Sequence, residues 1–404
     1  MVNTIIRKIL ILLFVAGTAG ITKLEAASAK APVDYVNPYM GNISHLLVPT
    51  YPIVHLPNSM LRVYPQRGDY TSDKIHGLPL IQISHRGSFA FNLSPFQGDA
   101  SGLSRVINFE YDNEVTKPYH YQVDLCNQQL HVEFAPSHQS AIYHFDYKED
   151  KTPYLILNAG NGELEVSGNV ISGYQNMWNN LRVYIYMETD TLQSDKWEEG
   201  KRKAKGDNTC VVVGWDAAPL SLNVRYGISY ISVEQAKRNL RREIKDFDLK
   251  KVTSAGRKIW NEELGKISVS GGTENDRFVF YTSLYRCLER PVNISEEGRY
   301  FCVYDNRIHE DGGYAYYTDD WIWDSYRAAH PLRILTDRKK HTDVIRSFLR
   351  MSEFSSDHWF PNFPEVTGDS RRMNCNHGVS VIADAWYKGV RDFDLQKAYT
   401  YTKA

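Results

Sequence analysis

The fold of this chain is decided first by the stretch Leu181-Arg182-Val183-Tyr184-Ile185-Tyr186-Met187. β-Branched, aromatic and aliphatic residues dominate this stretch, which is typical of a β-strand. Strands of the same kind recur along the first 230 residues, among them residues 122–125, 130–134 and 154–157. Many short strands, with no long helical period between them, predict an antiparallel β-sandwich over residues 30–231.

The periodicity changes at Ser232. Ser232 followed by Gln235 matches a capping box, and residues with high helix propensity follow it. Apolar residues then return at helical spacing within residues 278–285. We therefore predict a helical linker over residues 232–270 and a helical domain over residues 271–404.

Two further apolar stripes lie in the helical half, within residues 341–354 and 379–386, and Gly389 stands where a helix C-terminus favours glycine. Several of these stripes have no recognisable partner in the sequence. Because a single layer of helices cannot bury all its apolar faces, the pattern favours an incomplete helical layer and a truncated chain.

The charge balance excludes one class of partner. The 404 residues contain 47 Lys and Arg against 48 Asp and Glu, a net charge of −1. A chain without a basic surface does not bind a phosphate backbone well, so no nucleic-acid partner is expected. No feature of the sequence specifies an oligomeric state.

The N-terminus predicts export. Arg7 and Lys8 precede an apolar run, and Ala27 and Ala29 fit a cleavage site. The run holds about 13 apolar residues, fewer than the 17–25 that a membrane helix needs. We therefore predict a signal peptide over residues 1–29, no membrane span, and a periplasmic or extracellular location.

The cysteines give no metal motif. Cys126, Cys210, Cys287, Cys302 and Cys375 are widely spaced, and none forms a Cys-x-x-Cys pair. This spacing argues against zinc ribbons and thioredoxin-like redox sites, and favours small buried hydrophobes. No metal ligand is predicted from the sequence.

The densest group of candidate functional residues surrounds Trp323, Asp324 and Arg327, within a helix expected over residues 321–329. An aromatic face can stack on a pyranose, a carboxylate can accept hydrogen bonds from two neighbouring hydroxyls, and an arginine three residues on can orient that carboxylate. The alternative is a core tryptophan beside an ordinary helix ion pair.

His377 is a second candidate for contact with a sugar. It lies in a polar loop just before a predicted helix, a position that often carries binding residues. The alternative is that Asn376 or His377 merely caps that helix.

The chain resembles glycoside hydrolase family 92, the calcium-dependent exo-α-mannosidases. Residues 323–332, WDSYRAAHPL, are similar to the family's WDTYRAxHPL segment. Residues 381–390, VIADAWYKGV, are similar to its VIADAYxKGI, and residues 36–41, VNPYMG, to its VNPFIGT start. These segments follow one another in the family's order.

The resemblance implies a fold and an activity. The implied fold is a β-sandwich joined by helices to an (α/α)6 barrel, of which residues 271–404 would be the N-terminal part. The implied reaction is inverting, calcium-dependent hydrolysis of terminal α-mannosides in a mannose-containing glycan. Trp323, Asp324, Arg327 and His377 would then bind the substrate.

The sequence also departs from the family. The tryptophan-bearing segment that helps to shape the family's sugar site has no clear counterpart near residues 67–70. The family's general acid, general base and main calcium ligands are expected beyond residue 404. The spacing of Asp319, Asp320 and Glu365 does not place two carboxylates across one glycosidic bond. A non-catalytic glycan-binding protein and an inactive fragment are therefore the alternatives.

Overall fold

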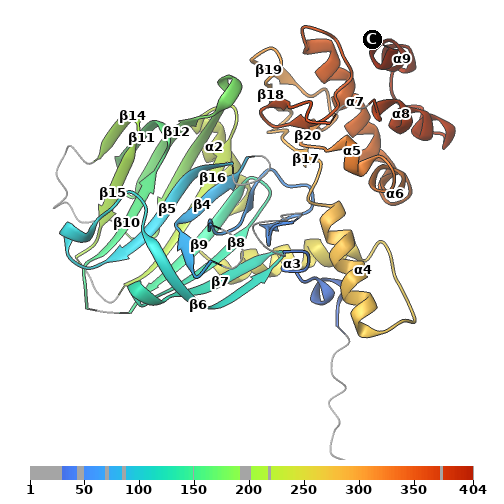
Figure 1. Cartoon of the computed structure of the whole chain (residues 1–404). Helices are drawn as coiled ribbons and strands as arrows, with labels where there is room; N and C mark the ends of the chain where they lie inside the picture. Colours follow the sequence, from blue (N-terminus) through green and yellow to red (C-terminus); the bar gives the residue numbers. More distant parts are fainter. Residues whose placement is uncertain are drawn as a thin grey trace, which may run out of the picture.

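A strand-rich domain precedes a helical region in this chain (Figure 1). The computed structural model describes residues 30–42, 50–68, 72–83, 88–148, 150–191, 202–216, 220–373 and 376–403. The predicted signal peptide, residues 1–29, lies outside the described residues. Among the residues described, no helix has the length and apolar character of a membrane span. The predicted order, β-structure first and helices second, is confirmed.

Ten strands of the described residues form one large sheet in which all neighbours are antiparallel. In spatial order they are β14 (Lys203–Asp207), β11 (Asn161–Ser167), β12 (Val170–Asn176), β13 (Arg182–Thr189), β16 (Leu220–Ser229), β9 (Ser140–Tyr147), β8 (Leu130–Pro136), β7 (His120–Leu125), β6 (Asn108–Lys117) and β3 (Lys74–His76). β7 alternates between buried and half-exposed residues, as a strand with one face on the core must.

A smaller antiparallel sheet packs against the large one. Its strands are β15 (Cys210–Gly214), β10 (Pro153–Asn158), β5 (Phe89–Gln97) and β4 (Leu78–Gln82). Side chains of both sheets belong to one hydrophobic core. Two buried hydroxyls tie the sheets together: Tyr226 Oη donates to the carbonyl of Leu80 at 2.8 Å, and Tyr147 Oη to that of Tyr154 at 2.7 Å.

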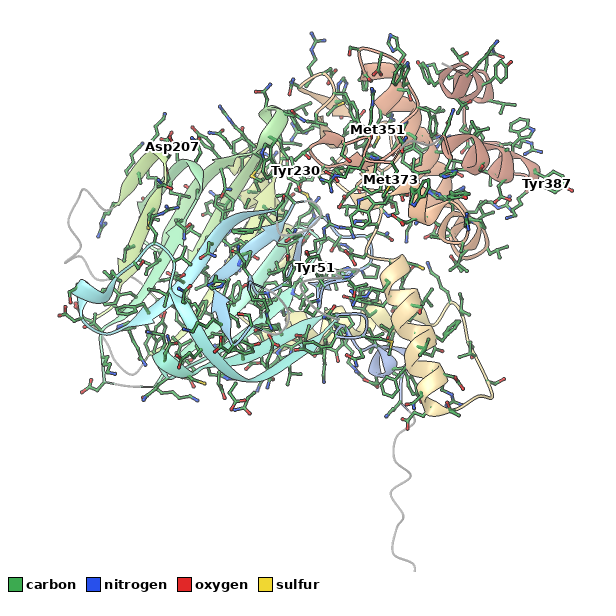
Figure 2. All side chains as sticks on the ribbon, in the orientation of Figure 1. Tyr51, Asp207, Tyr230, Met351, Met373 and Tyr387 are labelled. Atoms are coloured by element: carbon green, nitrogen blue, oxygen red, sulfur yellow. The ribbon has the colours of Figure 1, made fainter. Side chains whose placement is uncertain are left out.

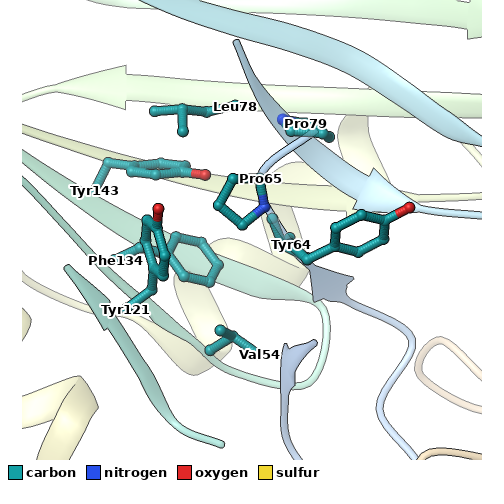
Figure 3. Close-up of a pocket in the computed structure, with 9 residues that line it drawn as sticks. Val54, Tyr64, Pro65, Leu78, Pro79, Tyr121, Phe134 and Tyr143 are labelled. Carbon is teal, nitrogen blue, oxygen red and sulfur yellow. The ribbon is translucent and has the colours of Figure 1, made fainter. Parts of the chain in front are cut away.

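The core between the sheets is nearly closed. A cavity of about 10 Å³ remains there, lined by residues such as Leu78, Tyr121 and Phe134 (Figure 3). A cavity needs at least about 10–15 Å³ to hold one water molecule. This cavity is therefore a packing irregularity and has no room for a sugar.

Three helices connect the β-domain to the rest of the chain: α2 (Val233–Glu243), α3 (Leu249–Leu264) and α4 (Glu274–Cys287). Each begins at a residue whose side chain accepts a hydrogen bond from a free backbone N–H, namely Ser232, Asp248 and Thr273. The short elements η1 (Pro32–Tyr35), β1 (Val54–His55) and β2 (Arg62–Val63) lie earlier in the chain, and η1 contacts α3 and α4.

The helical region contains five helices in the described residues: α5 (Ile322–Ser325), α6 (Ala329–Thr336), α7 (Arg338–Phe354), α8 (Gly378–Tyr387) and α9 (Leu395–Lys403). Short antiparallel pairs accompany them: β17 (Val292–Asn293) with β20 (Tyr317–Thr318), β18 (Arg299–Cys302) with β19 (Arg307–Glu310), and β21 (Pro364–Glu365) with β22 (Gly368–Asp369). The short 3₁₀ turns are η2 (Ala100–Gly102), η3 (Cys126–Gln128) and η4 (Trp178–Asn180).

The helix predicted over residues 321–329 is wrong. The chain forms the single turn α5, leaves helical geometry at Ala328, and starts α6 at Ala329. Pro331 lies in the first turn of α6. Backbone N–H groups in a first turn have no acceptor within the helix, so proline, which has no N–H, loses no hydrogen bond there. Pro331 therefore marks the beginning of a helix and not the end of one.

The helical region carries large apolar side chains on its surface. Leu335 of α6 is 80% exposed and Tyr387 of α8 is 89% exposed. Tyr387 projects away from the rest of the molecule at the edge of α8 (Figure 2). Neither residue belongs to the apolar stripes predicted within residues 341–354 and 379–386. Those stripes are mostly buried, since Val344, Ile345 and Phe348 are 0% exposed and Ile382 is 6% exposed, so the expectation that they lack a partner is wrong for these residues.

The packing of α2 on β16 gives a test of this fold. A Cβ added at Gly227 would lie 2.2 Å from the carbonyl oxygen of Ala236 and 2.9 Å from the backbone nitrogen of Leu240. Gly227→Ala must push the helix off the sheet, so we expect a loss of about 1–3 kcal/mol in the free energy of unfolding. Gly68→Ala, where no atom lies within 4 Å of the added Cβ, is the control. Equal thermal unfolding midpoints for the two variants would contradict this packing.

Candidate functional site

A pocket lies where the end of α4 meets α5 and α6. Its volume is about 230 Å³, and it is lined by Thr50, Arg286, Cys287, Glu289, Arg290, Asp320, Trp321, Asp324, Ser325, Ala329 and Arg333. The sequence brings these residues from four separate segments. The lining combines a dense set of charges with an indole ring.

The indole of Trp321 forms an aromatic wall of the pocket. One side chain stacks on it, since the ring centroids of Trp321 and Phe363 are 5.4 Å apart with an interplanar angle of 12°. The guanidinium carbon of Arg290 lies 3.8 Å from the centroid of the Trp321 ring. Such a cation–π contact fixes both groups, so this wall is rigid before any ligand arrives.

Glu289 is held as an anion inside a cluster of arginines. It forms an ion pair with Arg290, and lies 3.9 Å from Arg286 and 4.0 Å from Arg62. Burial by itself would raise the pKa of Glu289, but the surrounding guanidinium groups outweigh burial and lower it to about 2. A carboxyl with so low a pKa cannot act as a general acid near neutral pH.

Asp319 links the pocket to the β-domain. Its side chain is fully buried and forms an ion pair with Arg62 of β2, while the Arg290 Nε atom lies 3.5 Å from its Oδ2 atom. The φ of Asp319 is 57°, in the left-handed region that aspartate tolerates better than most residues. The buried ion pair fixes the chain here and positions the adjacent Asp320 and Trp321.

Both side-chain oxygens of Asp320 also contact neighbouring polar groups. Its Oδ1 atom accepts a hydrogen bond from the hydroxyl of Ser325 at 2.6 Å, and its Oδ2 atom lies 3.2 Å from His330 Nε2 and 4.0 Å from Arg333. Burial would raise the pKa of Asp320, but His330, Arg333 and the Ser325 hydroxyl together lower it well below the usual range. Asp320 therefore has a structural role in the floor of the pocket.

Asp324 differs from these two carboxylates. It lines the pocket, and none of the described residues forms a hydrogen bond or ion pair with its side-chain oxygens. Burial, and then the negative charge of Asp320, raise the pKa of Asp324, against the opposing effect of Arg290. An unpaired carboxylate facing an open pocket is available to accept hydrogen bonds from a ligand.

The other predicted site residues, Trp323, Arg327 and His377, do not line the pocket. Trp323 is 44% exposed, and its ring centroid lies 5.3 Å from that of His377, which stacks on Tyr326 at 3.8 Å. The structure thus brings Trp323 and His377 together. It does not pair Arg327 with Asp324: the Nε atom of Arg327 donates to the Tyr326 hydroxyl at 2.8 Å.

The helix-cap alternative for His377 finds no support. His377 occupies the cap position of α8, yet its side chain makes no capping hydrogen bond. Asn376 donates instead to the carbonyl of Thr402 in α9, at 2.8 Å. The His377 ring is thus left to its aromatic neighbours.

The buried charges of this site were not among the residues predicted from the sequence. Arg62, Glu289 and Arg290 carry no local motif, and Arg62 stands 257 positions from Asp319. His330 lies within the segment that resembles family 92, and that resemblance is the one feature of the sequence that points to a buried residue of this site. Glu365 lies nearby with its carboxylate 3.4 Å from Arg372, and burial followed by the charge of Asp319 raises its pKa.

Two sequence models of one family match this chain. The glycosyl hydrolase family 92 N-terminal domain matches residues 35–229, and the glycosyl hydrolase family 92 catalytic domain matches residues 235–404. The chain belongs to glycosyl hydrolase family 92. The junction between the two matches coincides with the start of α2, where the sequence periodicity changes.

Solved family 92 structures share this fold. The family GH92 inverting mannosidase BT2199 from Bacteroides thetaiotaomicron is 27% identical with a TM-score of 0.82, covering 92% of this chain and 55% of that one. The α-mannosidase BT3965 of the same organism, in complex with mannoimidazole, is 22% identical with a TM-score of 0.83, covering 93% and 55%. This family 92 chain therefore spans about half the length of these relatives.

A curated relative is similar over a shorter region. It comes from Arthroderma benhamiae, is described as an uncharacterized secreted glycosidase, and is 28% identical over 107 residues. The match covers 23% of this chain and 14% of that protein. It agrees with the glycosidase family that the two sequence models identify.

The described residues do not fit a calcium site. Calcium takes six to eight oxygen ligands, and the carboxylates of Glu289 and Asp320 are already paired with cations. Only one group of three metal-ligating side chains occurs in the part of the chain that the structure describes: Cys302, Asp305 and His309. A thiol and an imidazole are poor ligands for calcium.

The buried ion pair between Arg62 and Asp319 is testable. Removal of one partner leaves a buried charge uncompensated, so Asp319→Asn should lower the free energy of unfolding by about 3–5 kcal/mol in urea titration. The double variant Arg62→Met with Asp319→Asn should recover part of that loss. Lys203→Ala, which removes an exposed pair with Glu165, should not change the urea midpoint. A stable Asp319→Asn variant would contradict the role we give this pair.

Proposed function

We propose that this chain forms the sugar-binding part of a glycoside hydrolase that removes terminal α-mannosides from glycans with inversion. The observation that carries the proposal is the unpaired Asp324 carboxylate in a pocket of about 230 Å³ beside the Trp321 indole. A carboxylate beside an aromatic face suits a pyranose, which has hydroxyls on its edge and C–H groups on its faces. The inverting mannosidase BT2199, which shares the fold, supports this choice of substrate.

Several side chains in and around the pocket have roles in this proposal. Asp324 accepts hydrogen bonds from two neighbouring hydroxyls of mannose. Trp321 lines the pocket with Arg290 over its ring, and Trp323, which lies outside the lining, presents exposed aromatic surface to the sugar. His377 extends the aromatic surface beyond Trp323.

Inversion requires two carboxyl groups, an acid and a base, about 6.5–9.5 Å apart. Glu289 and Asp320 line the pocket, but their ion pairs hold them as anions. Asp324 alone cannot serve both roles. We therefore assign no general acid or base among the described residues, and calcium, which the family resemblance implies, is left without assigned ligands.

The pairing of the pocket carboxylates also supports a second candidate function. With one unpaired carboxylate among the described pocket residues, this part of the chain has what glycan binding needs and lacks the acid–base pair that inversion needs. The second candidate is a glycan-binding protein without catalytic activity. The two candidates agree on the ligand and differ in whether mannose is released.

Titration of the intact chain with mannoimidazole tests the binding role of Asp324. Loss of charge-assisted hydrogen bonds is worth about 1.5–3 kcal/mol, so Asp324→Ala should bind about 10- to 100-fold more weakly with an unchanged circular dichroism spectrum. Because the ionised form binds, affinity should fall on acidification through a pKa higher than that of an ordinary aspartate. Asp207→Asn, at the far end of the β-domain, is the control (Figure 2).

Release of mannose by the same chain separates the candidates in one direction. With calcium and an α-linked mannobiose, we expect the intact chain to bind sugar without releasing mannose, because no acid and base are assigned among the described residues. Release that scales with protein concentration and disappears in Asp324→Ala would contradict this expectation and rule out the second candidate. If Asp324→Ala and Asp324→Asn both unfold, Asp324 is structural and the proposed site is wrong.

We also propose that the chain is exported through removal of residues 1–29. The basic residues, the short apolar run and the small residues near Ala27 support this proposal. The relative described as a secreted glycosidase agrees with it. Mass spectrometry of extracytoplasmic chain should find an N-terminus near Lys30, and recovery of an intact Met1 would contradict removal.

A further inference from the structure

We propose that Cys302, Asp305 and His309 form a binding site for a zinc-like transition-metal ion, separate from the sugar pocket. One ligand atom of each side chain lies within 4.8 Å of the other two. The three residues belong to one hairpin, β18 and β19 with the turn between them. Thiolate, carboxylate and imidazole are together the ligands that Zn²⁺ favours, and calcium does not.

The register of the hairpin explains why these residues meet. Tyr300 pairs with His309 and Cys302 pairs with Arg307, all in antiparallel geometry. Since side chains alternate between the two faces of a strand, Tyr300, Cys302 and His309 share one face. Asp305 lies in the turn between the strands, and its carboxylate returns towards the same face.

Surrounding groups already hold two of the ligands in place. Asp305 Oδ1 accepts a hydrogen bond from the backbone N–H of Arg307 at 3.2 Å, and Asp305 Oδ2 lies 2.8 Å from His309 Nε2. The His309 ring stacks on Phe354 of α7 at 4.2 Å and on Tyr300 at 5.6 Å. Metal sites depend on this kind of outer support, because it fixes ring orientation and leaves less entropy to lose on binding.

The arrangement leaves room for an ion and a fourth ligand. Ligand atoms bound at about 2.0–2.3 Å to one tetrahedral ion lie about 3.5 Å apart. The three ligand atoms here lie within 4.8 Å of one another, so small side-chain rotations would bring them to that separation. Cys302 is buried, whereas Asp305 and His309 are partly exposed, and the fourth position therefore opens towards solvent.

Binding of the ion releases a proton and changes no oxidation state. The Cys302 thiol loses its proton to solvent as the sulfur–metal bond forms, and no oxidant or reductant takes part. His309 binds through the Nε2 atom that now faces Asp305. The ion would join both strands of the hairpin to its turn, and through the His309–Phe354 contact it would stabilise the packing of the hairpin on α7.

Cobalt titration of the intact, metal-stripped chain tests the site. We expect one Co²⁺ per chain, with a thiolate-to-cobalt charge-transfer band in the near ultraviolet and the visible bands of tetrahedral cobalt, both removed by Zn²⁺. Cys302→Ser should lose the charge-transfer band. Cys210→Ser, which removes another free cysteine in β15, should keep it, and so should Cys375→Ser.

A second set of variants tests the site even if Cys302→Ser fails to fold. His309→Gln and Asp305→Asn keep polar side chains of similar shape, and each should weaken cobalt binding by about 100-fold or more, beyond the loss known for outer-sphere residues. Circular dichroism should report an unchanged fold, and Zn²⁺ should raise the thermal midpoint of the intact chain alone. Absence of the charge-transfer band in the intact chain, or full affinity in Asp305→Asn and His309→Gln, would overturn the proposal.

Discussion

The buried ion pair between Arg62 and Asp319 is the interaction on which the rest of the site depends. Arg62 belongs to β2 of the β-domain, and Asp319 stands directly before the segment that lines the pocket. Neither charge reaches water, so each is tolerable only because the other is present. Joining two distant parts of the chain in this way fixes the position of Asp320, Trp321 and α5 relative to the β-domain.

This constraint explains which side chains are free to act. Glu289 neutralises arginine side chains, and Asp320 accepts a hydrogen bond from Ser325 and lies near Arg333, so both maintain the walls of the pocket. Asp324 is not needed for that balance and faces the open volume. A search for carboxylates in the sequence cannot separate these roles, because they differ in partners and not in residue type.

The relationship to family 92 mannosidases fits this division of roles. The shared fold brings the β-domain against the first helices of the catalytic region, and the chain spans about half the length of the solved relatives. The described residues include the pocket with the Asp324 carboxylate and the Trp321 indole. The Cys302, Asp305 and His309 cluster has a different chemistry and a different place, on a hairpin against α7, so a metal there would act on stability and not on the sugar.

The sequence by itself determined the local structure. Alternating apolar residues specify β7 and β8, and Ser232 begins α2, because each signal acts over a few neighbouring residues. It also marked Trp323 and His377, which the structure brings together. The folded structure alone establishes that Arg62 neutralises Asp319, because these residues stand 257 positions apart and no local pattern records their approach. It also establishes that Pro331 lies in the first turn of α6 and that Arg327 bonds Tyr326, because several local conformations are open to these residues until their neighbours are packed.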